Sequence, residues 1–548
     1  MVKVNKRWRH ILSWLELPGA NLKLPSNTTV CRMPQEIELK LALDPRDVLR
    51  LRDSQIPRAS RLNHSARQRL VSTYYDTPSF SLWRSGIILR VRKIGRERVQ
   101  SVKMNGAESG GLARRVELES SFRGDRPDLM QIVDPDVRRL IQLRCSDNDL
   151  VSIFVTDVVR ETWVLQLGRS RIECAIDRGI IAADGRTAPI CEVELELKSG
   201  QPVRLFQLAH RLNAIVPLRI EAASKAARGY DLANNARLTA PTAAPVHIDP
   251  TMSVRGSFAA IARACVAHVL ASADYAYKSN DPEGIHELRV SIRRMRAAFA
   301  VFRGAMPERY RFPIGDELRV LQRKFGIARE WDVLVEETIA SMPRRLRKQR
   351  SSEKVVQIAQ TKRVEGYKSA HAALRNPRYT DLLLQLASWI DSQFGFGAPP
   401  TQKRKWKPNV LAGPAPHFAS EVMRAYHERA RKLGKKIRKL DTAELHMLRI
   451  RVKKLRYATE FFGSIWPSRR TKRYLSALNV LQQVLGALHD ATVAEKLVAQ
   501  VKTAGAGNVK FATAPVNHWL INCQQRSRKE AIELWGRFAK RKLFWGNT

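Results

Sequence analysis

The sequence of 548 residues is poor in cysteine, and its few cysteines form no pattern. They are scattered along the chain as Cys31, Cys145, Cys174, Cys191, Cys265 and Cys523. Zinc sites and disulfide frameworks need cysteines at short, paired spacings, so neither is predicted. Isolated thiols are typical of a reducing compartment, and we expect a cytoplasmic location.

Long apolar runs are also lacking. No stretch approaches the roughly 20 apolar residues that a membrane helix requires, so no membrane span is expected. The segment Ile11–Leu15 is apolar, but Glu16 interrupts it before it reaches the length of a signal sequence. Residues 1–32 show no sustained periodicity, and we expect them to form a loose extension before Met33.

Acidic residues are scarce relative to basic ones. Lys and Arg number 96 against 52 Asp and Glu, which gives a formal net charge of +44. This excess indicates a polyanionic partner: nucleic acid, polyphosphate or an anionic membrane surface. The length allows two or three domains; the oligomeric state stays open.

A short stretch near the start of the ordered pattern, residues 35–40, reads as a strand with charge on one face. Side chains alternate across a strand, so Glu36, Glu38 and Lys40 share a face opposite Ile37 and Leu39. Two carboxylates side by side repel unless something positive lies between them. A divalent cation could do this, with Lys40 holding an anion beside it. A solvated face of an antiparallel sheet is the alternative interpretation.

Further strands up to about residue 232 repeat this pattern, and their charges differ in sign from strand to strand. One carries Arg90 and Arg92, whereas another carries Glu192, Glu194 and Glu196. A closed barrel with a polar lumen would bring these charges into one cavity, where carboxylates suit metals and cations suit phosphate oxygens. Salt-bridge ladders on a surface would explain single pairs but not the sorting by strand. A pair of strands is predicted within residues 154–166.

The ordered set of these motifs resembles the CYTH family, the triphosphate tunnel metalloenzymes, over residues 33–232. Glu36 to Lys40 matches the family's ExExK signature. The resemblance implies an eight-stranded antiparallel tunnel that hydrolyses a triphosphate with Mg²⁺ or Mn²⁺. It implies metal-binding and catalytic roles for Glu36, Glu38, Glu192 and Glu194, with Asp177 as a further catalytic candidate. It implies substrate-binding roles for Lys40, Arg90, Arg92, Lys103, Arg160 and Lys225. Which of Arg114 and Arg115 enters the lumen is open.

Beyond a linker, expected at 233–250, the pattern becomes helical and repeats itself at an offset of 160 residues. Two markers align in register: His286–Arg289 with His446–Arg449, and Gly326–Glu330 with Gly486–Asp490. Two markers at one offset indicate a duplication. Each copy has a helix with an apolar stripe and a separate basic row. The rows are His286, Arg289, Arg293 and Arg296, and His446, Arg449, Lys453 and Arg456.

A basic row can be simply a solvated helix face, but its recurrence in both copies favours a shared anion groove. The paired helices resemble the CHAD domain. The resemblance covers about 251–535, with repeats at about 251–391 and 417–535 before a basic tail at 536–548. It implies two four-helix bundles that bind inorganic polyphosphate through these rows.

The chain is therefore expected to be a multidomain α+β protein that resembles the CYTH–CHAD inorganic triphosphatases of bacteria. Its expected ligands are inorganic triphosphate and polyphosphate. A nucleoside or thiamine triphosphatase, an adenylate cyclase and a non-catalytic polyphosphate-binding protein are the alternatives. Nucleic acid is a less favoured partner, because the basic rows lack interleaved exposed aromatics for base stacking.

Overall fold

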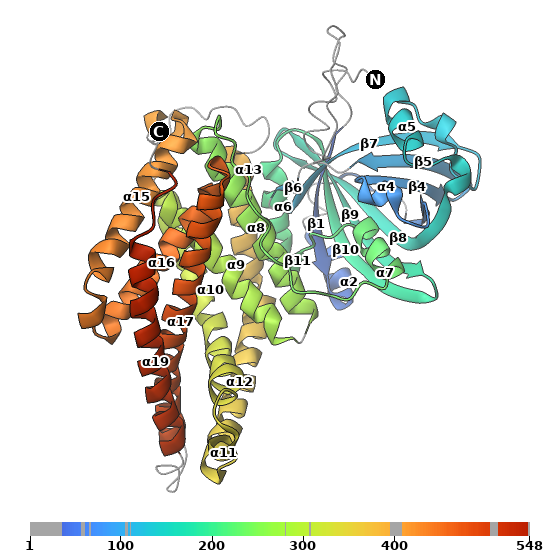
Figure 1. Ribbon diagram of the computed structural model, residues 1–548. Helices are drawn as coiled ribbons and strands as arrows, with labels where there is room; N and C mark the ends of the chain where they lie inside the picture. Colours follow the sequence, from blue (N-terminus) through green and yellow to red (C-terminus); the bar gives the residue numbers. More distant parts are fainter. Residues whose placement is uncertain are drawn as a thin grey trace. The chain divides into compact units, whose positions relative to one another are not determined.

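The computed structural model describes residues 35–55, 61–64, 67–104, 108–109, 111–279, 281–305, 308–394, 408–504 and 513–545. The expected extension at 1–32 lies outside these residues. The chain divides into two compact units, shown in Figure 1. The first comprises Met1–Leu238 and Pro377–Gly395, and the second comprises Thr239–Asn376 and Phe396–Thr548.

The first unit is built on a closed antiparallel barrel. Among the described residues, eight strands form its wall in the order β1 (Gln35–Leu43), β10 (Arg186–Ser199), β9 (Ser170–Ala183), β8 (Val151–Leu167), β3 (Gln68–Asp76), β4 (Ile87–Ile94), β5 (Glu97–Met104) and β7 (Leu112–Phe122). Strand β7 pairs with β1 and closes the ring. Short strands β2 (Arg61–His64), β6 (Glu108–Ser109) and β11 (Leu218–Ile220) pair with β8, β7 and β1. The predicted eight-stranded antiparallel barrel is confirmed.

The alternation read from the sequence sets the two faces of this wall. On β1, Leu39 and Leu41 are fully buried on the outer face, while Glu38 and Lys40 point into the barrel. The prediction of two strands within residues 154–166 was wrong, because β8 runs unbroken for 17 residues. No Gly or Pro interrupts this segment, so nothing in it forces a turn.

Short helices and one helix from far along the sequence pack on the outside of the barrel (Figure 1). They are η1 (Pro45–Asp47), α2 (Val48–Arg52), α4 (Ser81–Arg84), η2 (Leu129–Gln131), α5 (Pro135–Gln142), η3 (Asp147–Asp149), α6 (Val203–Asn213), α7 (Lys225–Ala233) and α13 (Pro377–Phe394). Polar contacts fix α13: Asp381 lies 2.7 Å from His210 Nδ1 and 2.8 Å from Asn213 Nδ2, and Asp391 lies 2.7 Å from Arg114. The last helix before the second repeat therefore belongs to the barrel unit.

The second unit consists of two copies of a four-helix arrangement. The first copy contains α8 (Val254–Lys278), α9 (Pro282–Val301), α10 (Glu308–Asp332) with the π-helix η4 (Val333–Ile339), the short α11 (Arg344–Arg347), and α12 (Arg350–Arg375). The second contains α14 (Pro408–Ala412), α15 (Ala415–Gly434), η5 (Ile437–Lys439), α16 (Thr442–Phe462), η6 (Gly463–Ile465), α17 (Arg469–Ala504) and α19 (Ala514–Ala539). Corresponding long helices begin about 160 residues apart, as the duplicated four-helix prediction requires.

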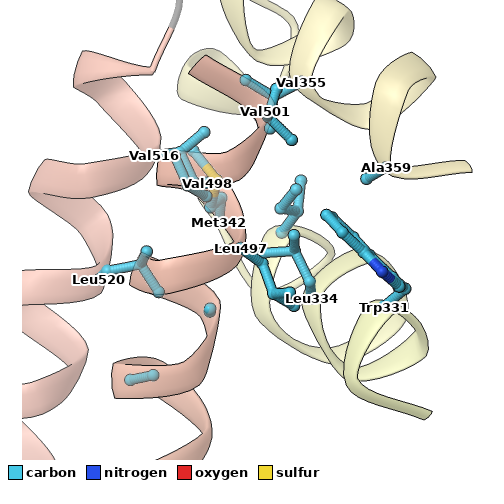
Figure 2. Packing of buried hydrophobic residues seen from close by; sticks show 13 residues of the cluster. Trp331, Leu334, Met342, Val355, Ala359, Leu497, Val498, Val501, Val516 and Leu520 are labelled. Carbon is cyan, nitrogen blue, oxygen red and sulfur yellow. The ribbon is translucent and has the colours of Figure 1, made fainter. Parts of the chain in front are cut away.

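The apolar stripes of the motif helices are buried. Leu288, Ile292 and Met295 on α9 and Leu448 and Val452 on α16 are fully inaccessible to solvent. A second cluster joins the two copies, as Figure 2 shows. Its members come from α10, η4, the segment after η4, α12, α17 and α19: Trp331, Leu334, Ile339, Met342, Val355, Ala359, Ala491, Ala494, Leu497, Val498, Val501, Val516 and Leu520. The two copies thus share one hydrophobic core.

Helix α8 is the one described helix that is long and apolar enough to meet the criteria for a membrane span. Of its most apolar stretch, 61% is buried inside the protein. Core helices of a duplicated bundle commonly have this composition.

Candidate active site and anion groove

The barrel encloses a cavity of about 290 Å³, and charged side chains make up most of its lining. Its basic side chains are Lys40, Arg90, Arg92, Lys103, Arg115, Arg160, Lys198 and Lys225. Its acidic side chains are Glu36, Glu38, Glu117, Glu119, Glu173, Asp177, Glu194 and Glu196. All six substrate-binding residues predicted from the resemblance line this one cavity.

On the side formed by β1, β5 and β7, each cation lies against a carboxylate. Lys103 Nζ is 2.8 Å from Glu36 and 3.0 Å from Glu117. Lys40 contacts Glu38 directly and lies 3.8 Å from Glu194. Burial opposes the charge on Lys40, but these two carboxylates outweigh it and raise the pKa of the lysine. The ExExK strand therefore places both its acids and its lysine in one charge network.

On the adjoining strands β10 and β9, three carboxylates form a tight group around one lysine. The carboxylate oxygens of Asp177, Glu192 and Glu194 lie within 4.8 Å of one another. Lys225, at the start of α7, lies 2.6 Å from Asp177 and 2.9 Å from Glu194 and also contacts Glu192. Arg160 makes two hydrogen bonds to Asp177, at 2.7 and 2.6 Å. Burial works against ionisation, but Lys225 and Arg160 hold the pKa values of Asp177 and Glu194 below their usual range.

This oxygen-rich group fits a hard divalent cation. Glu192 and Glu194, both proposed as metal ligands from the resemblance, belong to this group together with Asp177. Glu36 instead pairs with Lys103, and Glu38 pairs with Lys40 of its own strand. The ammonium group of Lys225 lies among the same oxygens. A bound cation would therefore compete with this lysine for the carboxylates.

Arg92 differs from the other tunnel cations because, within the described part of the chain, no carboxylate lies within ion-pair distance of it. Its Nε donates to Ser72 Oγ at 3.1 Å. Burial, together with the neighbouring charges of Arg90 and Arg160, lowers the pKa of Arg92 to about 10. Among the tunnel cations, Arg92 should therefore bind an anion most strongly, since its charge is not already neutralised by a carboxylate.

The structure also assigns tunnel residues that the motif analysis left open or missed. Arg115 enters the lumen and lies 3.3 Å from Glu38, while Arg114 faces outward to α13. Glu117 and Glu119 lie 3.1 and 3.5 Å from Arg90. The alternation of residues 115–119 places these side chains on one face, so the signal was present in the sequence.

A second cavity, about 670 Å³ in volume, lies between the two copies of the helical unit. Its basic lining residues are His286, Arg289, Arg293, Arg296, Arg329, His446, Arg449, Lys453, Lys454 and His489. Its acidic ones are Glu330, Glu337 and Asp490. We call this cavity the helical groove. Seven of the eight predicted row residues line it; Arg456 does not and instead binds Glu460 and Gln482.

Equivalent contacts recur in the two copies of the helical unit. Arg296 contacts Gln322, and 160 residues later Arg456 donates to Gln482 at 2.7 Å. Arg293 reaches across to the second copy and donates to Tyr457 Oη at 2.9 Å. The π-helix after α10 carries Glu337, which pairs with Arg329 at the edge of the groove. The two basic rows therefore form one shared surface.

Each of the two units matches the model of a known domain family. Residues 34–230 match the CYTH domain, and residues 260–499 match the CHAD domain. The chain therefore contains a CYTH domain followed by a CHAD domain.

Its relatives include an inorganic triphosphatase of Haemophilus influenzae, which is 33% identical over 214 residues. That match covers 38% of this chain and 57% of the relative. An uncharacterized protein of Mycobacterium tuberculosis is 25% identical over 497 residues, which is 86% of this chain and 90% of that protein. The crystal structure of the CHAD domain from the plant Ricinus communis covers 56% of this chain and 98% of that domain, at 25% identity and a TM-score of 0.48.

Proposed function

We propose that the protein is a cytoplasmic, metal-dependent inorganic triphosphatase, with a helical domain that binds polyphosphate. In this proposal residues 33–232, together with α13, form the catalytic tunnel domain, and the rest of residues 251–535 forms the polyphosphate-binding domain. The observation that carries the catalytic part is one cavity whose lining includes both Arg92, which has no carboxylate partner among the described residues, and two carboxylates of a close group. Asp177 and Glu194 line the cavity, and the buried Glu192 completes the group with its oxygens within 4.8 Å of theirs. Phosphoryl transfer needs both kinds of site, because catalysis depends on positioning and charge neutralisation.

The cations of the tunnel would bind the triphosphate. Arg92 offers an uncompensated charge, and Arg90 and Arg160 lie beside it. Lys40 and Lys103 would exchange their carboxylate partners for phosphate oxygens as the substrate enters. A triphosphate carries four to five negative charges, so it can replace several carboxylates in one network. Ser72 would keep the Arg92 guanidinium oriented.

Asp177, Glu192 and Glu194 would hold Mg²⁺ or Mn²⁺, with Glu36 and Glu38 as the further carboxylates that the family resemblance assigns. Such a cation supplies charge neutralisation at the phosphate oxygens and lowers the pKa of a bound water. A carboxylate of the tunnel would orient the attacking water toward the terminal phosphorus. Lys225 would move from the carboxylates to the phosphate when a metal takes its place.

The helical groove would bind polyphosphate without chemistry of its own. Its charged side chains are mainly basic, and most of them belong to the rows of α9 and α16. Its carboxylates are separated along the groove by arginines, as the Arg329–Glu337 and Arg449–Asp490 contacts illustrate. Tethering a long polyphosphate chain to the same polypeptide as the tunnel domain would raise its effective concentration.

A substrate panel tests the catalytic proposal. Phosphate release by the full chain is measured from inorganic triphosphate, ATP and thiamine triphosphate, with Mg²⁺, with Mn²⁺ and with EDTA. The proposal expects the highest kcat/KM for inorganic triphosphate, and no phosphate release from any substrate in EDTA. Preferential cleavage of ATP or thiamine triphosphate, or formation of a cyclic nucleotide, would assign one of the other triphosphate reactions. Binding of triphosphate without turnover would leave a non-catalytic ligand site.

A further inference from the structure

At four basic positions both halves of the helical groove contribute a lining residue, and the residue type differs at two of the four. The halves correspond at an offset of 160 residues, and His286, Arg289 and Arg296 of the first copy recur as the same residue types in the second. Where the first copy has Arg293, however, the second has Lys453; where the first has Arg329, the second has His489. In both cases a permanently charged arginine is replaced by a group that can lose its proton.

Lys453 is placed where a positive charge is disfavoured. It is partly buried on α16, with Arg449 and Arg456 about one helical turn away on either side. Arg293 faces it from α9, and Asp490 faces it from α17. No carboxylate of the described residues lies within ion-pair distance of Lys453. Its counterpart Arg293 is held by Tyr457, and Lys453 has no such hydrogen bond in the described structure.

His489, on α17, also lies where a positive charge is disfavoured. Its Nδ1 atom is 3.0 Å from Nδ1 of His446, so one ring donates and the other accepts. That contact is lost when both rings are protonated. His446, Arg449 and Lys453 face His489 from α16, and Lys496 adds a charge from α17 itself. The surroundings of the histidine pair are therefore cationic on both packed helices.

We propose that the second half of the helical groove is a proton-coupled anion site, in which Lys453 and the His446–His489 pair take up protons when a polyphosphate chain binds. The first half binds the same chain at constant charge through its arginines. The inference rests on the proposed polyphosphate binding and adds its regulation by pH. Affinity should therefore rise as the pH falls.

The electrostatics give the direction of this coupling. Burial and then the charges of Arg449, Arg293 and Arg456 lower the pKa of Lys453 to about 6 in the free groove. Burial and then Arg449 and His446 lower the pKa of His489 to about 3. A polyanion in the groove reverses the repulsion and raises both values. Asp490, whose pKa burial raises, changes in the same direction, so substitutions are needed to identify the lysine.

Calorimetric titration of the full chain with long inorganic polyphosphate tests the inference. EDTA removes divalent metal so that the tunnel does not consume the ligand, and the titration is repeated between pH 6 and pH 8. Buffers that differ in ionisation enthalpy report the number of protons taken up. Uptake of about one proton corresponds to an affinity that falls up to about tenfold for each pH unit.

Two matched substitutions separate lysine from arginine at the same structural position. Lys453→Arg keeps the positive charge but cannot lose it, so it should flatten the pH dependence and remove most of the proton uptake. Arg293→Lys introduces a second titratable amine and should steepen the dependence. Circular dichroism confirms that each variant is folded, and the second variant keeps the test decisive if the first does not fold.

The outcomes distinguish the two proposals. A wild-type protein that binds polyphosphate with the same affinity from pH 6 to pH 8 overturns the proton coupling alone. Unchanged proton uptake in both variants overturns the assignment to this position of the row. A chain that does not bind polyphosphate at any pH overturns the proposed function of the groove, and the coupling with it.

Discussion

Arg92 offers a test in which binding and stability change in opposite directions. A pKa that falls from 12.5 to about 10 means that charging this group costs roughly 3 kcal/mol more in the folded protein than in the unfolded one. At pH 7 the group is charged in both states, so this cost is fully present. Arg92→Met keeps much of the side-chain volume and removes the charge. Water in the tunnel screens part of the cost, so we expect a gain of about 1–3 kcal/mol in the free energy of unfolding.

The same substitution removes the tunnel's uncompensated anion-binding charge. We expect kcat/KM for inorganic triphosphate to fall by at least about 100-fold, since a charge-assisted contact to phosphate contributes roughly 3 kcal/mol in a buried site. Triphosphate should also stabilise the variant less than the wild type, because stabilisation by a ligand follows its affinity.

Arg160→Met is the matched control, because Arg160 lies in the same cavity but is paired with Asp177 and Glu194. Removing one partner of a buried ion pair leaves the other uncompensated and costs about 3–5 kcal/mol. Thermal unfolding without triphosphate measures the stability of both variants. Hydrogen exchange of the β4 and β8 amides shows whether the change in stability lies in the barrel. A loss of stability in Arg92→Met as large as that in Arg160→Met would refute the reasoning.

Two further predictions concern stability. The pKa of Lys453 is about 6 in the folded protein against 10.5 in the unfolded chain, so folding disfavours the protonated form. The free energy of unfolding of the ligand-free helical unit should therefore rise between pH 6 and pH 9. This group contributes at most about 1.4 kcal/mol per pH unit. Thermal midpoints across this range should show the slope in the wild type and a smaller one in Lys453→Met; equal slopes would contradict the assignment. Gly229→Ala would place a Cβ 2.1 Å from the Phe154 ring and should destabilise the barrel by about 1–3 kcal/mol in urea unfolding. Gly95→Ala is the control: its Cβ would have no atom within 4 Å, but its φ of +61° is unfavourable for alanine, so it reports only the backbone cost of the substitution.

Much of the barrel followed from the sequence because period-two alternation reports the environment of each side chain directly. Residues 35–40 and 191–197 could be assigned to strands with a charged inner face for this reason. Alternation does not report register, so it could not show that Lys225 lies among Asp177, Glu192 and Glu194. The length of β8 was predicted wrongly although the sequence carried a signal, because residues 151–167 contain no Gly or Pro to form a turn.

In the helical half, the sequence predicted the motif helices but not the positions of every residue and helix. The 160-residue offset identified both motif helices, and their apolar stripes are buried as the 3.6-residue period requires. The same period could not separate Arg456 from the rest of its row, because Glu460 and Gln482 bind it away from the groove. Nor could it place α13, whose position depends on contacts of Asp381 and Asp391 with residues of the barrel unit more than 150 positions away.

The division of labour between tunnel and groove is the central claim, and one paired measurement tests it. Phosphate release from inorganic triphosphate and binding of long polyphosphate are measured for the wild type, for Glu36→Gln and for the double variant Arg289→Glu/Arg449→Glu, across a salt series. The amide at position 36 keeps its shape but loses the charge of a metal ligand, so metal-dependent release should stop while polyphosphate binding persists.

The double variant should show the converse. Polyphosphate binding should weaken strongly and its salt dependence should flatten, by analogy with counterion release from nucleic acids, while triphosphate hydrolysis continues. Loss of triphosphatase activity in the folded double variant would contradict the account, because the groove would then be part of one active site. Wild-type turnover by Glu36→Gln would contradict the metal-binding role proposed for Glu36.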